Sequence, residues 1–224
     1  MPQGTAELRG GAGASKEAVM KKLVVGVIPD GVRTWWSLHQ SSGDLYAAYR
    51  KAAREGAKIV EGAPEMGVER VVFYAMSQWD VLRRSEEQVR AMRGGITEFC
   101  RMMKTRPHVE VNAYGDFQLM SLELLVQKSC GPSMLTVDLL VGYSAEWDLQ
   151  DRPVRTAPIP EVDVVVRTKG RHSLSGFLPL QANYAELYVY QGLWPSSGYR
   201  AFRSAVSRCK EHQAEVSRSG GRGA

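Results

Sequence analysis

A carboxylate, a glycine and an arginine follow directly on the first apolar run of the sequence. They are Asp30, Gly31 and Arg33. Such a group can hold a phosphate, because a glycine lets backbone N–H groups approach an anion, an arginine presents a planar fork of donors, and an aspartate can ligate Mg²⁺. A surface turn with a solvated aspartate and arginine has the same composition, so the pattern alone leaves both interpretations open.

A second cluster of polar residues lies much later, within residues 167–177. Four of its side chains are cationic or potentially cationic, and three carry hydroxyls: Arg167, Lys169, Arg171 and His172, with Thr168, Ser173 and Ser175. So many phosphate-binding groups are unusual for a solvated loop, and anions favour glycine-containing loops of this kind. The cluster therefore favours an anion-binding site.

Two shorter segments add candidate residues. Ser77 and Arg84 lie in one of them, and Ser85, followed by two glutamates, has the pattern of a helix N-cap. Surface charge is the simplest interpretation of the arginine. Glu186 is a carboxylate in an aromatic stretch, where burial would require a metal or an arginine as its partner. A solvated glutamate at an edge fits the same pattern.

Short apolar runs alternate with stretches of helical periodicity, and these elements must position the polar residues. Strands are predicted for residues 23–28, 71–76, 109–114, 135–142 and 162–167. Helices are predicted for residues 45–60, 85–104 and 118–128. Residues 150–161 contain three prolines and are predicted to be a non-helical connection. The alternation predicts an α/β fold of one domain, with a central parallel sheet of about six strands flanked by helices. Ligands of such folds bind beyond the carboxyl ends of the strands, where both polar clusters begin.

The composition narrows the functional class. The 224 residues are 44% hydrophobic and 24% charged, which is typical of a globular protein. No apolar run approaches the ~20 residues of a membrane helix, so we expect a cytoplasmic protein without integral membrane association. The net charge of +5 would suit nucleic acid, anionic lipid or a phosphorylated substrate. Because the basic residues cluster at predicted strand ends instead of forming an extended stripe, we expect no nucleic-acid partner.

Three parts of the chain are distinguished by composition. We predict a flexible N-terminal tail at residues 1–20, the folded domain at 21–210 and a C-terminal tail at 211–224. The last residues, from 214, are small and basic and are expected to lack fixed structure unless a partner, such as a second copy of the chain, orders them. Three well-separated cysteines indicate neither a zinc site nor a disulfide framework.

Taken together, these residues resemble the cis-prenyltransferase family, which has the undecaprenyl diphosphate synthase fold. The blocks that carry the resemblance are Asp30 and Gly31 with Trp35, residues 74–77, residues 163–168, Gly170, Ser175, Phe177, residues 184–188 and residues 193–195. The family implies a homodimer, a hydrophobic tunnel and two diphosphate sites that use Mg²⁺. The helix with the stripe Val89, Met92, Ile96, Phe99 and Met103 would wall the tunnel, although core packing explains the stripe equally well.

The resemblance assigns roles position by position. Asp30 and Glu186 would hold Mg²⁺. Catalytic roles are implied for Asp30, Ser77, Tyr46 and Tyr49, where either tyrosine could occupy the position of a family histidine. Substrate binding is implied for Gly31, Val32, Arg33, Thr34, Trp35, Met76, Arg84, Arg167, Ser173 and Ser175.

Several departures from the family pattern affect the diphosphate contacts. Val32 replaces an asparagine, Thr34 replaces an arginine, and Ser173 replaces another arginine. Each lost charged hydrogen bond costs ~1.5–3 kcal/mol if nothing compensates for it. The pattern is similar to the irregular, lavandulyl-type branch known from actinobacterial specialised metabolism, whose members join two allylic diphosphates head to middle.

The resemblance therefore implies a Mg²⁺-dependent prenyltransferase. We expect it to condense dimethylallyl diphosphate with geranyl diphosphate to a branched product such as isosesquilavandulyl diphosphate. A regular short-chain cis-prenyltransferase that uses isopentenyl diphosphate is the first alternative. A non-catalytic partner subunit is the second, although the retained Asp30 weighs against it.

Overall fold

The computed structural model describes residues 22–39, 44–117 and 125–220. Its centre is one sheet of six parallel strands in the order β3-β4-β2-β1-β5-β6. The strands are β1 (Leu23–Ile28), β2 (Val68–Ser77), β3 (Val109–Tyr114), β4 (Leu135–Tyr143), β5 (Val164–Arg167) and β6 (Glu186–Val189). The helices are α1 (Val32–Leu38), α2 (Leu45–Gly62), α3 (Gln78–Arg83), α4 (Glu86–Met103), α6 (Ala145–Asp148) and α7 (Trp194–Gly220), with a short 3₁₀ helix η2 (Pro64–Met66). The predicted single-domain α/β fold with a central parallel sheet is confirmed.

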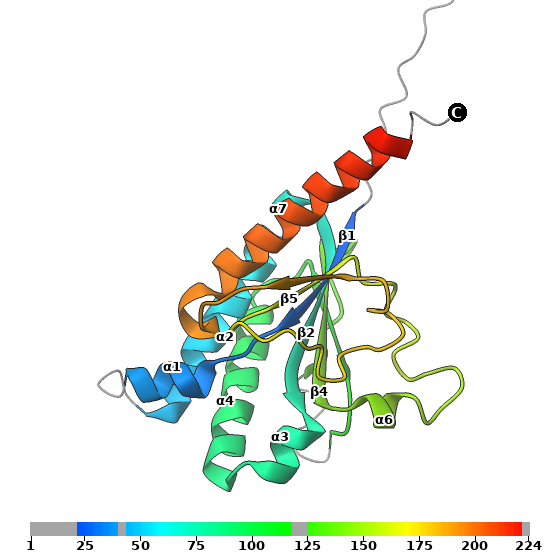
Figure 1. Cartoon of the computed structure of the whole chain (residues 1–224). Helices are drawn as coiled ribbons and strands as arrows, with labels where there is room; N and C mark the ends of the chain where they lie inside the picture. The colour runs from blue at the N-terminus through cyan, green and yellow to red at the C-terminus, as the bar shows by residue number, and fades with distance from the viewer. Residues whose placement is uncertain (1–21, 40–43, 118–124, 221–224) are drawn as a thin grey trace, which may run out of the picture.

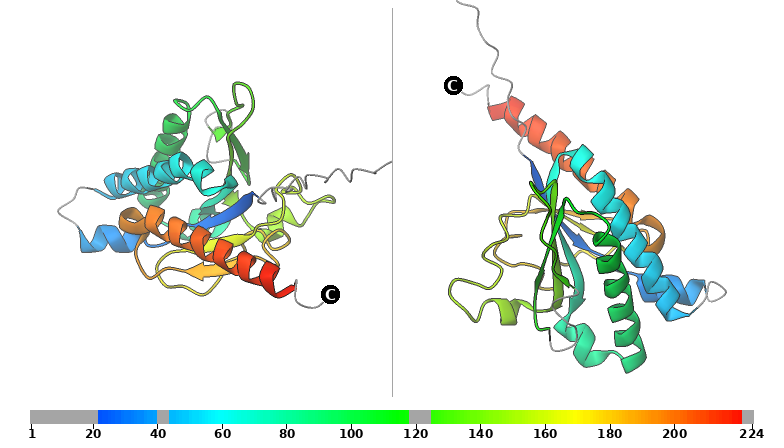
Figure 2. Two further views of the ribbon diagram at one scale, coloured as in Figure 1. Left: turned by 90° about the horizontal axis from the view of Figure 1, so that it is seen from above. Right: turned by 180° about the vertical axis from the view of Figure 1, so that it is seen from behind.

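Helices cover one face of the sheet, and irregular chain covers the other. Figures 1 and 2 show α2, α4 and α7 packed together on one side, with α6 and its neighbouring loops on the opposite side. Successive strand residues point to opposite faces, so Val25 and Val27 pack under the helices whereas Val24 packs with Phe177 and Leu178 of the irregular segment. All six residues of β1 are buried, as expected for a central strand covered on both faces.

Helices α2 and α4 approach closely because Gly95 of α4 has no side chain where it faces Tyr49 of α2. A Cβ atom on Gly95 would lie 2.9 Å from the Cβ atom of Tyr49 and 3.0 Å from its carbonyl oxygen. The predicted cap of α4 is confirmed, since the Ser85 hydroxyl accepts a hydrogen bond from the backbone N–H of Gln88 at 3.3 Å. These contacts fix α4 as a wall facing the sheet.

Some predicted elements differ in the structure. The helix predicted at 118–128 falls mostly outside the described residues, and at its end Gln127 forms an isolated antiparallel bridge with Val111 instead of a helical turn. Residues 150–161 are turns, as predicted. The predicted tail at 1–20 lies outside the described residues. No helix in the described ranges is both long and apolar enough to cross a membrane.

The C-terminal prediction was wrong over most of its length. Helix α7 runs on to Gly220, past the boundary predicted at residue 210. Residues 211–218 contain neither glycine nor proline, so nothing in them ends a helix that packing has already started. On this part of α7, His212 Nδ1 also lies 2.7 Å from Glu186 Oε1, which ties the helix to β6.

Candidate active site

The site lies next to β1, at the point where the order of the strands in the sheet reverses. β1 neighbours both β2 and β5, and the chain leaves β1 toward β2 but leaves β5 toward β6. Loops that diverge in this way open a crevice at the carboxyl edge of a parallel sheet. Ile28, at the end of β1, is in register with Arg167, at the end of β5. The two polar clusters of the sequence are thus brought to one crevice.

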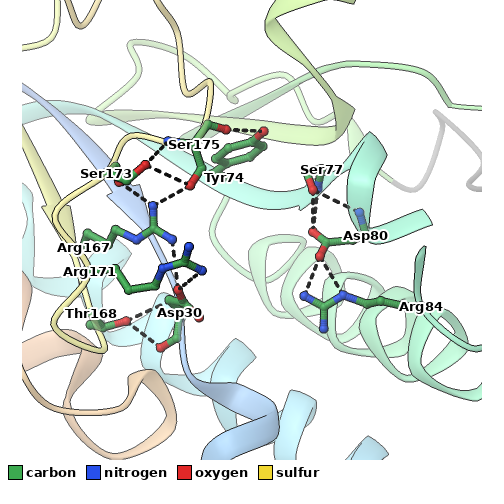
Figure 3. A network of polar contacts seen from close by, with 10 residues as sticks. All are labelled: Asp30, Tyr74, Ser77, Asp80, Arg84, Arg167, Thr168, Arg171, Ser173 and Ser175. Carbon is green, nitrogen blue, oxygen red and sulfur yellow. Dashed lines mark hydrogen bonds and ion pairs between the residues drawn. The ribbon is translucent and has the colours of Figure 1, made fainter. Parts of the chain in front are cut away.

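Asp30 and Arg167 form the central ion pair of this crevice. Arg167 Nη2 lies 3.0 Å from Asp30 Oδ2, and Arg171 Nη1 lies 3.9 Å from the same oxygen (Figure 3). The expected meeting of the Asp30 turn with the arginine-bearing loop is confirmed. Within the described ranges Asp30 Oδ1 has no hydrogen-bond or ion-pair partner. Asp30 also borders the cavity described below.

Arg167 is buried and held by its own loop. Its side chain is 4% exposed, and Nη1 donates to Ser175 Oγ at 2.7 Å and to the carbonyl oxygen of Ser173. Among the described residues Nε finds no partner although it is buried. Lys169 and Ser175 adopt positive φ angles of 68° and 51°. Strain of this kind costs about 1–3 kcal/mol per residue and is concentrated at binding sites.

Thr168 fixes the backbone of the turn after β1. Its hydroxyl donates to the carbonyl oxygen of Asp30 at 2.7 Å and accepts from the N–H of Asp30 at 2.9 Å. Gly31 follows with φ 102°, and a Cβ atom there would lie 2.8 Å from Leu193 Cδ2. The turn therefore requires glycine both for its backbone angle and for the space next to Leu193.

A further polar cluster, made of Ser77, Asp80 and Arg84, lies at the end of β2, on the other side of the same crevice. Ser77 Oγ donates to Asp80 Oδ2 at 2.8 Å, and the N–H of Ser77 donates to the same oxygen at 2.9 Å. Asp80 Oδ1 accepts from Arg84 Nε at 2.6 Å and from Arg84 Nη2. Arg84 Nη1 also donates to the Tyr49 hydroxyl at 3.4 Å. Burial raises the pKa of Tyr49, an effect that the nearby Arg84 and Arg33 partly offset, so this hydroxyl is protonated at neutral pH.

A cavity of about 730 Å³ joins the Asp30 and Arg167 ion pair to the cluster of Ser77, Asp80 and Arg84. Its polar end includes Asp30, Arg33, Arg84 and Arg167, and its apolar end lies between α2, α4 and the sheet. The side chains at the apolar end include Leu45, Ala53, Phe73, Met92, Ile96, Phe99, Leu139 and Trp194. Of the predicted tunnel stripe, Met92, Ile96 and Phe99 border the cavity, while Met103 is buried in the core. A cavity of this size and polarity suits a ligand with an anionic head and an apolar chain.

Most of the residues predicted for the site border this cavity. They are Asp30, Gly31, Val32, Arg33, Thr34, Tyr49, Ser77, Arg84, Arg167 and Ser175. The structure thus groups them in one place, and their roles in a reaction remain predictions.

Trp35 and Met76 are not part of the cavity wall. Met76 is 1% exposed and packs in the core beneath the helices. Trp35 is also buried, and its ring stacks on the ring of His39 with centroids 4.5 Å apart. Trp36 borders the cavity instead. Both side chains point into the core and neither borders the cavity, so their contact with a substrate stays a prediction.

Tyr46 and Ser173 are likewise outside the cavity wall. Tyr46 is 38% exposed and packs against Gly94 of α4, so of the two candidate tyrosines only Tyr49 reaches the cavity. The carbonyl oxygen of Ser173 accepts from Arg167, and its hydroxyl accepts from the N–H of Ser175 at 3.2 Å. Ser173 thus shapes the loop around Arg167 instead of facing a substrate.

Glu186 lies at the opposite end of its strand from the crevice. It pairs with Val164 at the start of β5, whereas Arg167 pairs with Val189. Three strand residues separate these levels by about 10 Å. A magnesium ion shared by Asp30 and Glu186 of one chain is therefore ruled out by the topology. In the structure the partner of Glu186 is His212, and this hydrogen bond raises the pKa of His212.

Three residues that build the site were not among the predicted catalytic, substrate-binding or metal-binding residues. Asp80 and Thr168 make the contacts given above, and the Tyr74 hydroxyl donates to the carbonyl oxygen of Ser175 at 3.3 Å. The spacing Ser77-x-x-Asp80 is that of a capping box, and Arg84 follows Asp80 by four residues. These two spacings were the available signal for Asp80, while the contacts of Thr168 and Tyr74 depend on strand pairing that local sequence does not specify.

The donor set at the polar end fits a magnesium–diphosphate complex. Of the described residues around the cavity, the carboxylates are Asp30 and Asp80, and the hydrogen bonds from Ser77 and Arg84 occupy Asp80. Magnesium commonly takes one or two carboxylates and fills the remaining positions with water and substrate phosphate oxygens. Asp30 could serve in this way, since one of its oxygens has no partner among the described residues.

Comparisons with known proteins find prenyl diphosphate synthases. The family model described as "putative undecaprenyl diphosphate synthase" matches residues 145–217, the part that contains the Arg167 loop. A geranylgeranyl-diphosphate-specific tritrans,polycis-undecaprenyl-diphosphate synthase of Aeropyrum pernix is 28% identical over 76% of this chain and 87% of its own length. A (2Z,6E)-farnesyl diphosphate synthase of Mycobacterium tuberculosis is 25% identical over 89% of this chain and 88% of its own.

A solved structure shows the same fold. It is lavandulyl diphosphate synthase from Lavandula x intermedia in complex with dimethylallyl diphosphate, which matches 84% of this chain and 95% of its own with a TM-score of 0.68 and 17% identity. The matching family model and the curated relatives make this chain similar to the undecaprenyl diphosphate synthase family, the cis-prenyltransferases, and its six-stranded parallel sheet has the fold of the lavandulyl diphosphate synthase.

Proposed function

We propose that this protein condenses two allylic diphosphates head to middle, joining dimethylallyl diphosphate to a geranyl donor. The observation that carries the proposal is the composition of the cavity wall at its polar end. By the resemblance, Val32 stands where regular members of the family have an asparagine and Tyr46 or Tyr49 stands near the position of a family histidine, and Val32 and Tyr49 border the cavity. In the described part of the chain the wall contains neither an asparagine nor a histidine. The groups that manage isopentenyl diphosphate in regular enzymes are thus missing.

The charges of the wall suit two diphosphates. Among the described residues five cationic side chains and two carboxylates border the cavity: Arg33, Arg84, Arg167, Lys169 and Arg171, with Asp30 and Asp80. Arg33 lies beside the Asp30 turn, where the leaving diphosphate of the donor would bind. Arg167 with Ser175, and Arg84 on the opposite side, would hold the diphosphate of the acceptor.

Ionisation of the donor is the step that these charges favour. When the allylic C–O bond breaks, negative charge grows on the departing diphosphate, and fixed arginine donors stabilise that charge more in the transition state than before it. Mg²⁺, held by Asp30 and phosphate oxygens, would add further stabilisation of the leaving group. The apolar end of the cavity keeps water from the allylic cation until the internal alkene carbon of dimethylallyl diphosphate attacks it.

The apolar end also limits chain length. Phe73 precedes Ser77 by four residues of β2, so it lies about 13 Å below the polar end of the cavity. The Phe73 ring meets the rings of Phe99 and Trp194 edge to face, with centroids 5.5 and 6.4 Å apart. Three aromatic rings that close a cavity favour a ten- or fifteen-carbon product over a long polyprenyl chain.

Incubation with paired substrates tests the proposal. The protein should convert dimethylallyl diphosphate and geranyl diphosphate, without isopentenyl diphosphate, into a branched product that mass analysis and NMR identify. Product that forms only when isopentenyl diphosphate is present would refute the head-to-middle reaction.

That second outcome would establish a regular short-chain cis-prenyltransferase. The curated relatives favour this alternative, because their names describe regular synthases such as the (2Z,6E)-farnesyl diphosphate synthase. No turnover of any allylic diphosphate, together with binding to an active homologue, would instead indicate a non-catalytic partner subunit.

A further inference from the structure

The coupling leaves a tertiary carbocation that must lose a proton, and the cavity wall narrows the choice of acceptor. Tyr46 lies outside the wall. Tyr49 borders the cavity, but among the described residues its hydroxyl is bonded only to Arg84, which can donate and cannot accept. Tyr49 therefore has no group to which it could pass its own proton after receiving another.

Ser77 differs because a carboxylate lies directly behind its hydroxyl. Ser77 Oγ is 2.8 Å from Asp80 Oδ2, which also accepts the N–H of Ser77 at 2.9 Å. The Ser77 hydroxyl in turn accepts the N–H of Asp80 at 3.1 Å. A hydroxyl oxygen has two lone pairs, so one lone pair remains on Ser77 while its proton is directed to Asp80. Both residues border the cavity, and Figure 3 shows the contact between them.

Arg84 holds the carboxylate in place. It donates from Nε at 2.6 Å and from Nη2 to Asp80 Oδ1, the oxygen that does not face Ser77. The two residues bind different oxygens of Asp80, since Ser77 donates to Oδ2 and Arg84 donates to Oδ1. The Asp80 side chain is 22% exposed and that of Arg84 is 19% exposed, so the pair is at the edge of the cavity instead of in bulk solvent.

We propose that Ser77 and Asp80 form the proton-accepting pair of this site, an inference that rests on the prenyl transfer proposed above. The C–H bond next to the cationic carbon breaks, and its electron pair forms the new double bond. The proton goes to Ser77 Oγ while the original hydroxyl proton moves to Asp80 Oδ2. Serine ends neutral, aspartate ends as the carboxylic acid, and that proton then leaves to solvent or diphosphate.

Two substitutions test the pair. Asp80→Asn keeps the size of the side chain and an oxygen acceptor for the N–H of Ser77 but removes the basic carboxylate. Ser77→Ala removes the hydroxyl together with the N-cap of α3. Ser85→Ala is the matched control, because Ser85 is the N-cap of the adjacent helix α4 and lies outside the cavity wall.

We expect Asp80→Asn and Ser77→Ala to lower kcat by about 100-fold or more, the usual contribution of a general base. The KM for either substrate should change little. With dimethylallyl diphosphate deuterated at its methyl groups, both variants should also show an altered isotope effect and an altered position of the new double bond. Ser85→Ala should keep the wild-type values for all three measurements.

The possible results separate this inference from the proposed function. Wild-type kcat, isotope effect and product in Asp80→Asn would overturn the pair and leave the departing diphosphate as the acceptor. A raised KM with an unchanged isotope effect would also overturn it, because Asp80 would then only orient Arg84. If the wild-type protein needs isopentenyl diphosphate, head-to-middle coupling fails, and the same variants are compared with isopentenyl diphosphate, whose condensation also ends in proton loss.

Discussion

Shortening Phe99 should change which donor the protein accepts. Phe99 borders the apolar end of the cavity, is 6% exposed and packs edge to face on Phe73 at 5.5 Å. Phe99→Leu removes the outer part of the ring and deepens the cavity toward α2, where Gly56 already lies against that ring. A donor with one more isoprene unit, farnesyl diphosphate, would gain the space that it lacks in the wild type.

The size of the effect follows from apolar packing. One methylene of fit or misfit in an apolar pocket is worth about 1–3 kcal/mol, or ~10–200-fold in kcat/KM. We therefore expect the ratio of kcat/KM for farnesyl over geranyl diphosphate to rise by ~10–200-fold. The loss of stability should be about 1–2 kcal/mol, between the cost of removing one methylene and that of removing a whole large side chain. The lost aromatic pair accounts for about 0.5–1.5 kcal/mol of it.

Competition between the two donors in one reaction measures this ratio directly, with products separated by mass. Phe202→Leu is the matched control, because Phe202 is fully buried in the same core but does not border the cavity. It should lose similar stability in thermal or urea unfolding and keep the wild-type donor ratio. An unchanged ratio in Phe99→Leu, or an equal change in both variants, would refute the assignment of Phe99 to the cavity floor.

Three further predictions concern the metal, the thiols and the helix contact. Asp30→Asn should lower product formation about 100- to 1,000-fold without loss of folding by circular dichroism, and chelation by EDTA should abolish wild-type activity until Mg²⁺ is restored; full activity in either case would contradict the metal site. In the native protein Cys130 should react rapidly with a thiol reagent, whereas burial raises the pKa of Cys100 to about 12 and should keep it unreactive up to pH 10. Mass mapping of labelled peptides measures both reactions, and labelling of Cys100 in the native protein would contradict the prediction. Gly95→Ala should destabilise the fold by about 1–3 kcal/mol and weaken substrate binding, because its Cβ atom would meet the backbone of Tyr49; unfolding in urea and KM values test both effects.

The central sheet could be predicted from sequence because its strands are continuous apolar runs. The bounds of β1 and β3 agree with the predicted ones, and β4 differs by one residue. The end of α7 could not be predicted in the same way. Its last turns are mostly polar and exposed, so no apolar periodicity marks them, and they persist because residues 211–218 continue a helix that is packed earlier.

Site residues could be predicted where several reactive residue types lie together in one short segment. They could not be predicted where their position depends on the pairing between strands. Asp30 and Arg167 each end a buried strand, so the sheet had to bring them to one edge. Glu186 has a suitable residue type, but the position of β6 against β5 places it at the other end of the sheet. Register is a property of the pairing, and the local sequence around Glu186 did not specify it.

The separation of the two polar clusters has a chemical consequence for the proposed reaction. Donor ionisation needs positive charge near the leaving group, and Arg33 lies there beside the Asp30 turn. Proton removal needs a base near the same cavity, yet a bare carboxylate would repel the diphosphates by several kcal/mol at low dielectric. Asp80 avoids this conflict, because Arg84 neutralises one of its oxygens while the other faces Ser77. One carboxylate oxygen thus faces the serine while the cluster as a whole carries no net negative charge, which allows an anionic substrate and a proton acceptor to share one cavity.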